Sequence, residues 1–168
     1  MNIDHTEMVA ELAKPGAEIK KDITPKTWGL MSWAITQFLC QGELLDRVKK
    51  VAVYNKEDNN LSGIPPQPVP NLTPEQCHLL HMAIGIAGEA SELLEAVFAH
   101  CNGKPLDLEN VIEESGDIEF YHEGLRQGAM FSRKHALQSN ILKLGQRYQG
   151  FQYSDKQAQL RADKAPGE

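Results

Sequence analysis

The sequence has few cysteines, and they form no recognisable pattern. Its 168 residues include three, Cys40, Cys77 and Cys101. An odd number of cysteines without the close spacing of metal ligands argues against both a disulfide framework and a cysteine metal site. The cysteine usage therefore predicts a reducing compartment.

Long apolar runs and an excess of basic charge are also missing. No stretch approaches the roughly 20 apolar residues of a membrane span. Asp4, Glu7 and Glu11 lie where a secretory signal would need its apolar segment. The net charge of −6 argues against a nucleic-acid backbone as the main partner. We therefore expect a cytoplasmic protein that binds neither nucleic acid nor a membrane.

Helix-start signals divide the sequence into four main helices. Thr24-Pro25 and Thr73-Pro74 each offer an N-cap followed by proline at the first helical position, and Gln76 completes a capping box at the second. Asp107 and Ser132 are candidate N-caps for two further helices. The length suits one domain, and a hydrophobic content of 41% is sufficient for a packed core. The predicted helices run from residue 25 towards 53, from 74 to the turn segment that begins at His100, from about 108 to 127 and from 133 to about 148.

The first two helices are separated by a proline-rich segment, residues 55–72. The run from Pro65 to Pro70 contains four prolines and fits neither a helix nor a central strand. It predicts an exposed loop inside a helical domain that spans residues 24–164. Residues 1–23 are expected to form a polar N-terminal segment, and residues 165–168 a flexible C-terminus.

Four aromatic or imidazole side chains are ambiguous between packing and binding. Trp28 and Trp33 have the chemistry to stack on a nucleobase, but on an amphipathic helix we expect them in the core. His78 and His81 precede the nearest acidic pair by more than two helical turns. We expect them to serve in packing, subunit contacts or base recognition before metal binding.

Two acidic pairs are the most informative feature of the sequence. Glu89 and Glu92 lie three residues apart, as do Glu114 and Asp117, so each pair shares one face of its helix. A short turn between His100 and Asp107 would make the two helices antiparallel neighbours. Four carboxylates would then converge at one seam, where their repulsion calls for a cation. Oxygen ligands of this kind suit Mg²⁺ or Mn²⁺.

The ordered pattern E-x-x-E followed by E-x-x-D resembles the signature of the MazG-like all-α nucleoside triphosphate pyrophosphohydrolases. Here it reads Glu89-Ala90-Ser91-Glu92 and Glu114-Ser115-Gly116-Asp117. The resemblance covers roughly residues 73–148, with weaker similarity to Lys164. It implies a MazG-like bundle of four main helices that assembles as a homodimer or homotetramer.

The same resemblance implies an activity and a set of site residues. The activity is Mg²⁺-dependent cleavage of a nucleoside triphosphate into the monophosphate and pyrophosphate, with Mn²⁺ as a substitute. The implied metal ligands are Glu89, Glu92, Glu114 and Asp117, and either Glu89 or the neighbouring Glu113 is the candidate general base. The implied substrate contacts, on one face of the fourth helix, are Asn140, Lys143 and Arg147.

Other interpretations remain open at this point. The basic face is equally compatible with a solvated surface or with a salt-bridged seam. A carboxylate-bridged di-iron protein needs Glu-x-x-His on two helices, whereas this chain has one such motif, Glu119-Phe120-Tyr121-His122. A non-catalytic bundle that binds nucleotide or serves in assembly is the main alternative to an enzyme.

Overall fold

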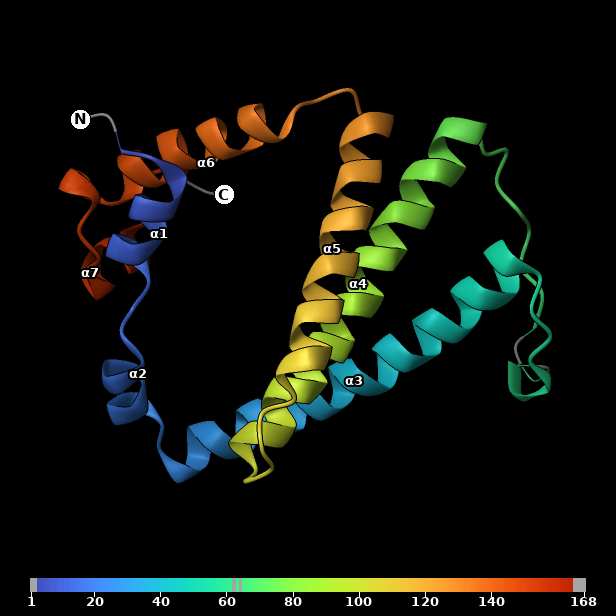
Figure 1. Cartoon of the computed structure of the whole chain (residues 1–168), viewed down its shortest axis with the longest axis horizontal. Coiled ribbons are helices and arrows are strands. Elements are labelled where there is room, and N and C mark those ends of the chain that lie inside the picture. Colours follow the sequence, from blue (N-terminus) through green and yellow to red (C-terminus); the bar gives the residue numbers. More distant parts are fainter. Residues whose placement is uncertain (1–2, 62, 64, 165–168) are drawn as a thin grey trace. The chain divides into compact units, whose positions relative to one another are not determined.

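The computed structural model describes residues 3–61, 63 and 65–164, and every regular element in these ranges is helical (Figure 1). The all-α prediction is therefore confirmed. The expected flexible C-terminus, residues 165–168, lies outside the described residues. The elements are α1 (His5–Leu12), α2 (Gly16–Asp22), α3 (Pro25–Tyr54), η1 (Asn59–Leu61), α4 (Pro74–Cys101), α5 (Leu108–Gly128), α6 (Arg133–Arg147), η2 (Gln149–Phe151) and α7 (Asp155–Leu160).

The expected helix starts agree with the observed caps. Thr73 accepts a hydrogen bond from the backbone N–H of Gln76, whose side chain bonds back to Thr73 in a complete capping box. The side chains of Asp107 and Ser132 accept backbone hydrogen bonds at the starts of α5 and α6. These bonds satisfy N–H groups that have no partner within the helix. Local sequence thus determines where the main helices begin.

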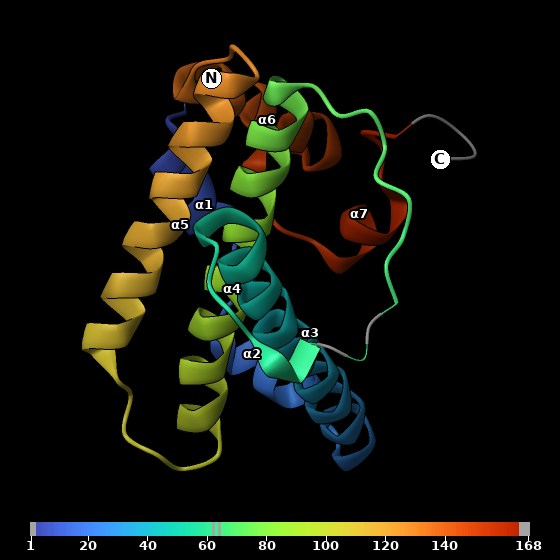
Figure 2. The ribbon, with the colours of Figure 1, turned by 90° about the vertical axis from the view of Figure 1, so that its right-hand side faces the viewer.

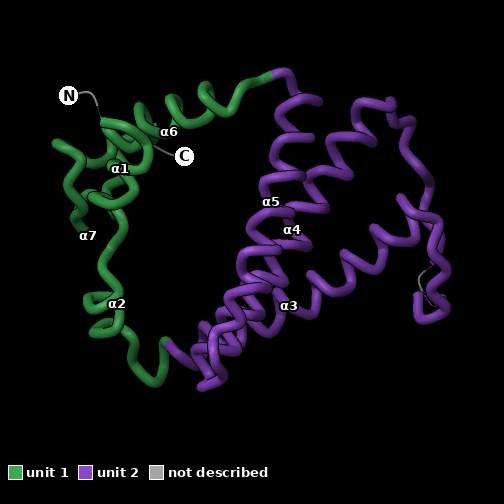
Figure 3. The backbone as a smooth tube through the Cα atoms, viewed as in Figure 1, with its two compact units in different colours: residues 1–27, 131–168 green, residues 28–130 purple. Residues whose placement is uncertain are grey.

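The chain divides into two compact units (Figure 3). The first contains residues up to Thr27 together with those from Phe131 onward, and the second contains residues 28–130. In this division α6 and α7 group with the N-terminal helices, and the single domain over residues 24–164 stays a prediction.

In the second unit, α4 and α5 lie antiparallel and side by side, as both ribbon views show (Figures 1 and 2). Glycines permit this close approach. A Cβ at Gly85 would overlap the ring of Tyr121, and one at Gly124 would overlap the Met82 sulfur. The predicted pairing of these two helices is therefore present.

Helix α3 crosses α4 at a point where both side chains are small. Gly42 of α3 faces Ser91 of α4 so closely that a Cβ at Gly42 would overlap both Cβ and Oγ of Ser91. Both residues are buried. Since Ser91 lies between Glu89 and Glu92, this crossing brings α3 to the first acidic pair.

The proline-rich segment is exposed, and its start is attached to α3. Arg47 forms a two-pronged ion pair with Asp58, with Nε–Oδ2 and Nη2–Oδ1 distances of 2.7 and 2.9 Å. The described residues from Pro65 to Pro70 are all exposed. The expectation of a surface loop therefore agrees with the structure, apart from the short η1 turn that it contains.

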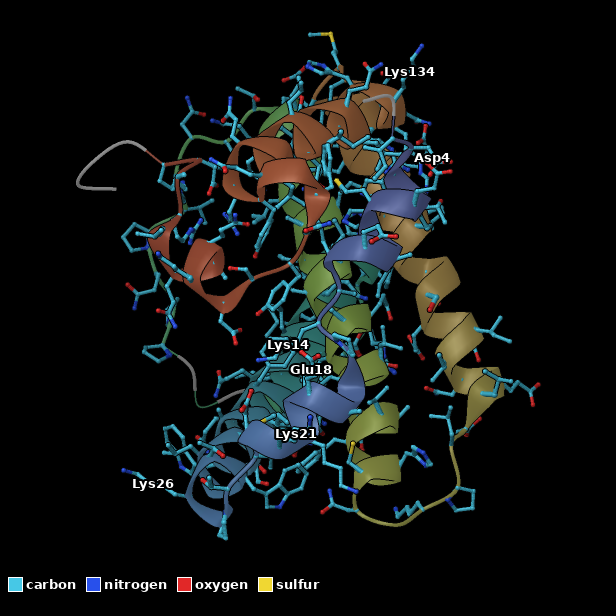
Figure 4. All side chains as sticks on the ribbon, turned by 90° about the vertical axis from the view of Figure 1, so that its left-hand side faces the viewer. Asp4, Lys14, Glu18, Lys21, Lys26 and Lys134 are labelled. Carbon is cyan, nitrogen blue, oxygen red and sulfur yellow. The ribbon has the colours of Figure 1, made fainter. Side chains whose placement is uncertain are left out.

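In the first unit, α1 packs on α6 and η2, and Met8 of α1 is fully buried. Lys14, which follows α1, donates hydrogen bonds to Asp22 at 2.8 Å and to Asp155 at 3.1 Å. Figure 4 shows Lys14 between α1 and α2, with Glu18 and Lys21 on α2. The N-terminal segment is thus helical and is tied to the C-terminal segment.

The second unit leaves many large apolar side chains exposed. On α3, Trp28 contacts Phe98 with ring centroids 6.0 Å apart, but Trp33 is 67% exposed. The expectation that Trp33 lies in the core is therefore wrong for this chain by itself, because the described residues leave that side of α3 uncovered. Further exposed apolar side chains on α3 and α5 are Leu30, Met31, Phe38, Leu108, Ile112 and Phe120.

Candidate metal centre

The pairing of α4 and α5 brings acidic side chains from both helices together. Glu89, Glu114 and Asp117 each offer one carboxylate oxygen, and these oxygens lie within 4.8 Å of one another. Glu89 and Glu114 are buried, whereas Asp117 is exposed. We call these three residues the carboxylate cluster. Three of the four predicted metal ligands therefore meet.

Glu92, the fourth predicted ligand, lies beside the cluster rather than within it. Burial, followed by the charges of Glu89 and Asp46, raises the pKa of Glu92 above its usual value. Glu92 also lines a cleft of about 530 Å³ with residues of α3 and of the start of α5, including Cys40 and Asn110. It is thus placed between the cluster and an open space.

Neighbouring positive charge compensates the negative charge of the carboxylate cluster only in part. Burial raises the pKa of Glu114 to about 7, with further contributions from the charges of Glu92 and Glu89. A buried carboxylate close to like charges takes up a proton more readily. A divalent cation at this position would remove the same repulsion.

The donor set fits a hard divalent cation. Mg²⁺ binds carboxylate and water oxygens at ~2.1 Å, so oxygens on opposite sides of one ion lie ~4.2 Å apart. The 4.8 Å limit on the oxygens of the cluster is only slightly wider. Glu89, Glu114 and Asp117 are therefore suited to hold Mg²⁺ or Mn²⁺, with Glu92 as a further donor beside them.

A buried lysine next to the cluster was not predicted from the sequence. Lys49 of α3 places its Nζ 3.1 Å from Glu89 Oε1 and 3.1 Å from Asp46 Oδ1. Burial lowers the pKa of Lys49, but the hydrogen bonds to Asp46 and Glu89 outweigh it and raise that pKa above the usual range. No sequence motif marks this lysine, because its contacts depend on how α3 crosses α4.

Lys49 also contacts Tyr121, whose ring packs against His81. Its Nζ is 3.5 Å from the Tyr121 hydroxyl and 5.2 Å from the centre of that ring. His81 makes edge-on contacts with Tyr121 and Tyr54, and burial followed by the charge of Lys49 lowers the His81 pKa. His78 Nε2 lies 3.0 Å from the Gly124 carbonyl oxygen. Both histidines therefore serve in packing here, in line with one of the roles expected for them.

The remaining predicted site residues do not belong to the cluster. Glu113, the second candidate base, is exposed on α5 and is not among the three clustered carboxylates. Asn140, Lys143 and Arg147 are on α6, in the first unit. Their proposed contact with substrate stays a prediction.

Arg147 already has a partner within its own unit. It forms a two-pronged ion pair with Asp163, with distances of 2.5 and 2.7 Å, and the Asp163 side chain is fully covered. This contact holds the pKa of Asp163 at about 2. Lys143, in contrast, is exposed. A structural role is therefore the simpler interpretation for Arg147.

Arg147→Ala and Asp163→Asn should each lower the melting temperature by several degrees, because each leaves a covered polar group without its partner. Lys143→Ala should leave the melting temperature unchanged and affect only kcat/KM. Calorimetry and steady-state kinetics on the three variants check this. An Arg147→Ala protein with normal stability but reduced kcat/KM would instead place Arg147 among the substrate contacts.

The shifted pKa of Glu114 predicts how stability depends on pH in the metal-free protein. Its folded value of about 7 exceeds the ordinary 4.5, so between these values the folded state binds more protons than the unfolded state. The stability that Glu114 contributes is full below pH 4.5 and is lost as the pH rises through 7. With EDTA present, Glu114→Gln should therefore raise the melting temperature relative to wild type at pH 8 and not at pH 4. An equal difference at both pH values would contradict the assignment.

Comparison of the chain with protein-family models, curated proteins and solved structures finds no match. Among the described residues, no helix has both the length and the apolar character needed to cross a membrane.

Proposed function

We propose that this chain is a Mg²⁺-dependent nucleoside triphosphate pyrophosphohydrolase with a MazG-like bundle of four main helices. The observation that supports this most is the convergence of Glu89, Glu114 and Asp117 from two antiparallel helices. Two features of the sequence predict this arrangement: the three-residue spacing within each acidic pair, and the order of the two pairs along the chain. A surface on which charged residues are scattered without function would not be expected to bury two carboxylates in mutual contact.

In this reaction the metal and the protein side chains would have different roles. Bound Mg²⁺ would offset phosphate charge and lower the pKa of a coordinated water. Glu89, Glu92, Glu114 and Asp117 would hold the metal, and Glu89 or Glu113 would accept the proton of the water that attacks the α-phosphorus. The bond from this phosphorus to the bridging oxygen would break, releasing pyrophosphate and the nucleoside monophosphate.

We also propose that the active form is a homodimer or homotetramer. The exposed apolar side chains on α3 and α5, among them Trp33, Ile112 and Phe120, support this, since burying such side chains against a second copy is favourable. Light scattering gives the mass in solution. Trp33→Asp should shift that mass toward the monomer, whereas a monomeric wild type would contradict the assembly.

A panel of standard and modified nucleoside triphosphates, assayed for pyrophosphate with Mg²⁺, with Mn²⁺ and with EDTA, tests the activity. We expect metal-dependent pyrophosphate release from at least one member of the panel and none with EDTA. Tight binding of a metal–nucleotide complex without product would favour the non-catalytic alternative. Absence of both binding and product across the panel would contradict the proposal.

A further inference from the structure

Lys49 is the part of the site that neither the acidic motifs nor the resemblance accounts for. Its side chain is 4% exposed and extends from α3 toward α4 and α5. A buried ammonium group is costly unless its hydrogen bonds are satisfied. Its three N–H groups have three acceptors within reach: Asp46, Glu89 and the Tyr121 hydroxyl. The group is therefore held in one position.

In that position the positive charge of Lys49 lies next to the carboxylate cluster. Lys49 shares Glu89 with the cluster, because Glu89 both accepts its hydrogen bond and offers an oxygen near Glu114 and Asp117. The neighbouring Lys50 differs. It pairs with Asp46 on the same helix, and its side chain is 43% exposed. One of two adjacent lysines thus donates a hydrogen bond to the cluster, while the other acts on the neighbouring Glu92 only through its charge and is partly screened by solvent.

Two consequences follow from a fixed cation beside a metal ligand. The hydrogen bond to Lys49 restrains the Glu89 carboxylate and so determines how it is presented to the other carboxylates. The positive charge also repels an incoming divalent cation, so it weakens metal binding in the absence of substrate. A triphosphate brings additional negative charge and would offset this repulsion.

We propose that Lys49 is a positioning residue of this site, which orients Glu89 and limits divalent-metal affinity until a triphosphate is bound. The role of Lys49 in orienting Glu89 for catalysis rests on the proposed function, whereas its effect on metal affinity rests on the carboxylate cluster alone. Lys49 thereby couples metal binding to substrate binding.

Manganese binding without nucleotide, followed by electron paramagnetic resonance, tests the charge of Lys49. Lys49→Gln removes the charge and retains an N–H donor. It should bind Mn²⁺ at least about 10-fold more tightly than wild type, since a unit charge several ångströms from a divalent ion has about this effect even at the dielectric constant of water. Lys50→Gln is the matched control and should give a clearly smaller gain than Lys49→Gln, because the more exposed charge of Lys50 is partly screened. Unchanged or weaker Mn²⁺ binding by folded Lys49→Gln would overturn the proposal, as would an equal gain in Lys50→Gln.

Lys49→Arg keeps the charge but changes the geometry, and it keeps the test decisive if Lys49→Gln does not fold. Its Mn²⁺ affinity should stay within about 2-fold of wild type because the charge is retained, while kcat should fall at least about 10-fold because Glu89 is displaced. Full kcat, or an affinity change beyond that range, would overturn the proposal.

The two proposals can fail separately. If wild type hydrolyses no triphosphate, the proposed function fails, and the Mn²⁺ titrations still measure the effect of Lys49. If wild type is active but Lys49→Gln binds Mn²⁺ no more tightly, the role of Lys49 is wrong and the activity stands.

Discussion

Asp117→Asn is expected to reduce metal-dependent hydrolysis at least about 100-fold, because it removes a ligand that holds and orients the metal. The helices should remain folded, since Asp117 is exposed and belongs to a cluster with excess negative charge. Neutralising one carboxylate relieves repulsion in the metal-free protein. We therefore expect an unchanged or slightly higher melting temperature in EDTA. Circular dichroism and pyrophosphate release on the same preparation give both values.

Two companion variants make this loss interpretable. Glu92→Gln should also lose most activity, because Glu92 lies next to the cluster and completes the predicted ligand set. Glu109→Gln changes an exposed carboxylate in the first turn of the same helix as Asp117 and should retain near-normal rates. Near-normal turnover in Asp117→Asn would refute the metal assignment. A similar loss in Glu109→Gln would attribute the effect to general charge.

Gly42→Ala should destabilise the second unit and separate α3 from α4. The added methyl group would overlap both Cβ and Oγ of Ser91, so rotation of the serine side chain alone cannot make room for it. Helix α3 would have to move away from α4, which typically costs about 1–3 kcal/mol for an overpacked interior. The same displacement would withdraw Lys49 from Glu89, so activity should fall as well.

Gly29→Ala is the matched control on α3. A Cβ at Gly29 meets no other atom within 4 Å, and alanine favours a helix by up to ~1 kcal/mol over glycine. This variant should therefore be slightly more stable than wild type. Denaturant titration of the two variants measures the difference. If Gly42→Ala were as stable as Gly29→Ala, the close crossing of α3 and α4 at Ser91 would be wrong.

The parts of the structure that depend on neighbouring residues were predictable from the sequence. Caps at Thr73, Asp107 and Ser132 are formed by residues three positions apart, so their chemistry determines where the helices begin. The acidic pairs follow helical spacing in the same way, and the short turn after α4 makes α4 and α5 neighbours. The meeting of carboxylates across these two helices therefore follows from local patterns.

Features that depend on contacts between distant segments could not be predicted in this way. Lys49 reaches Glu89 only because Gly42 allows α3 to approach α4, and no local pattern encodes that crossing. The ion pair between Arg147 and Asp163 occupies a side chain that the family resemblance assigned to substrate binding. Helical periodicity predicts which residues share a face of α3, but not whether another element covers that face. It therefore could not predict that Trp33 is exposed.

The reaction products test the central claim most directly, namely that the carboxylates of α4 and α5 hold a metal that serves triphosphate cleavage. Phosphorus NMR of the reaction in ¹⁸O-labelled water identifies the products and the phosphorus that water attacks. We predict equal amounts of nucleoside monophosphate and pyrophosphate, with the label in the monophosphate and no reaction in EDTA or with Asp117→Asn. Release of diphosphate and inorganic phosphate, or product formation that persists in Asp117→Asn, would contradict the account.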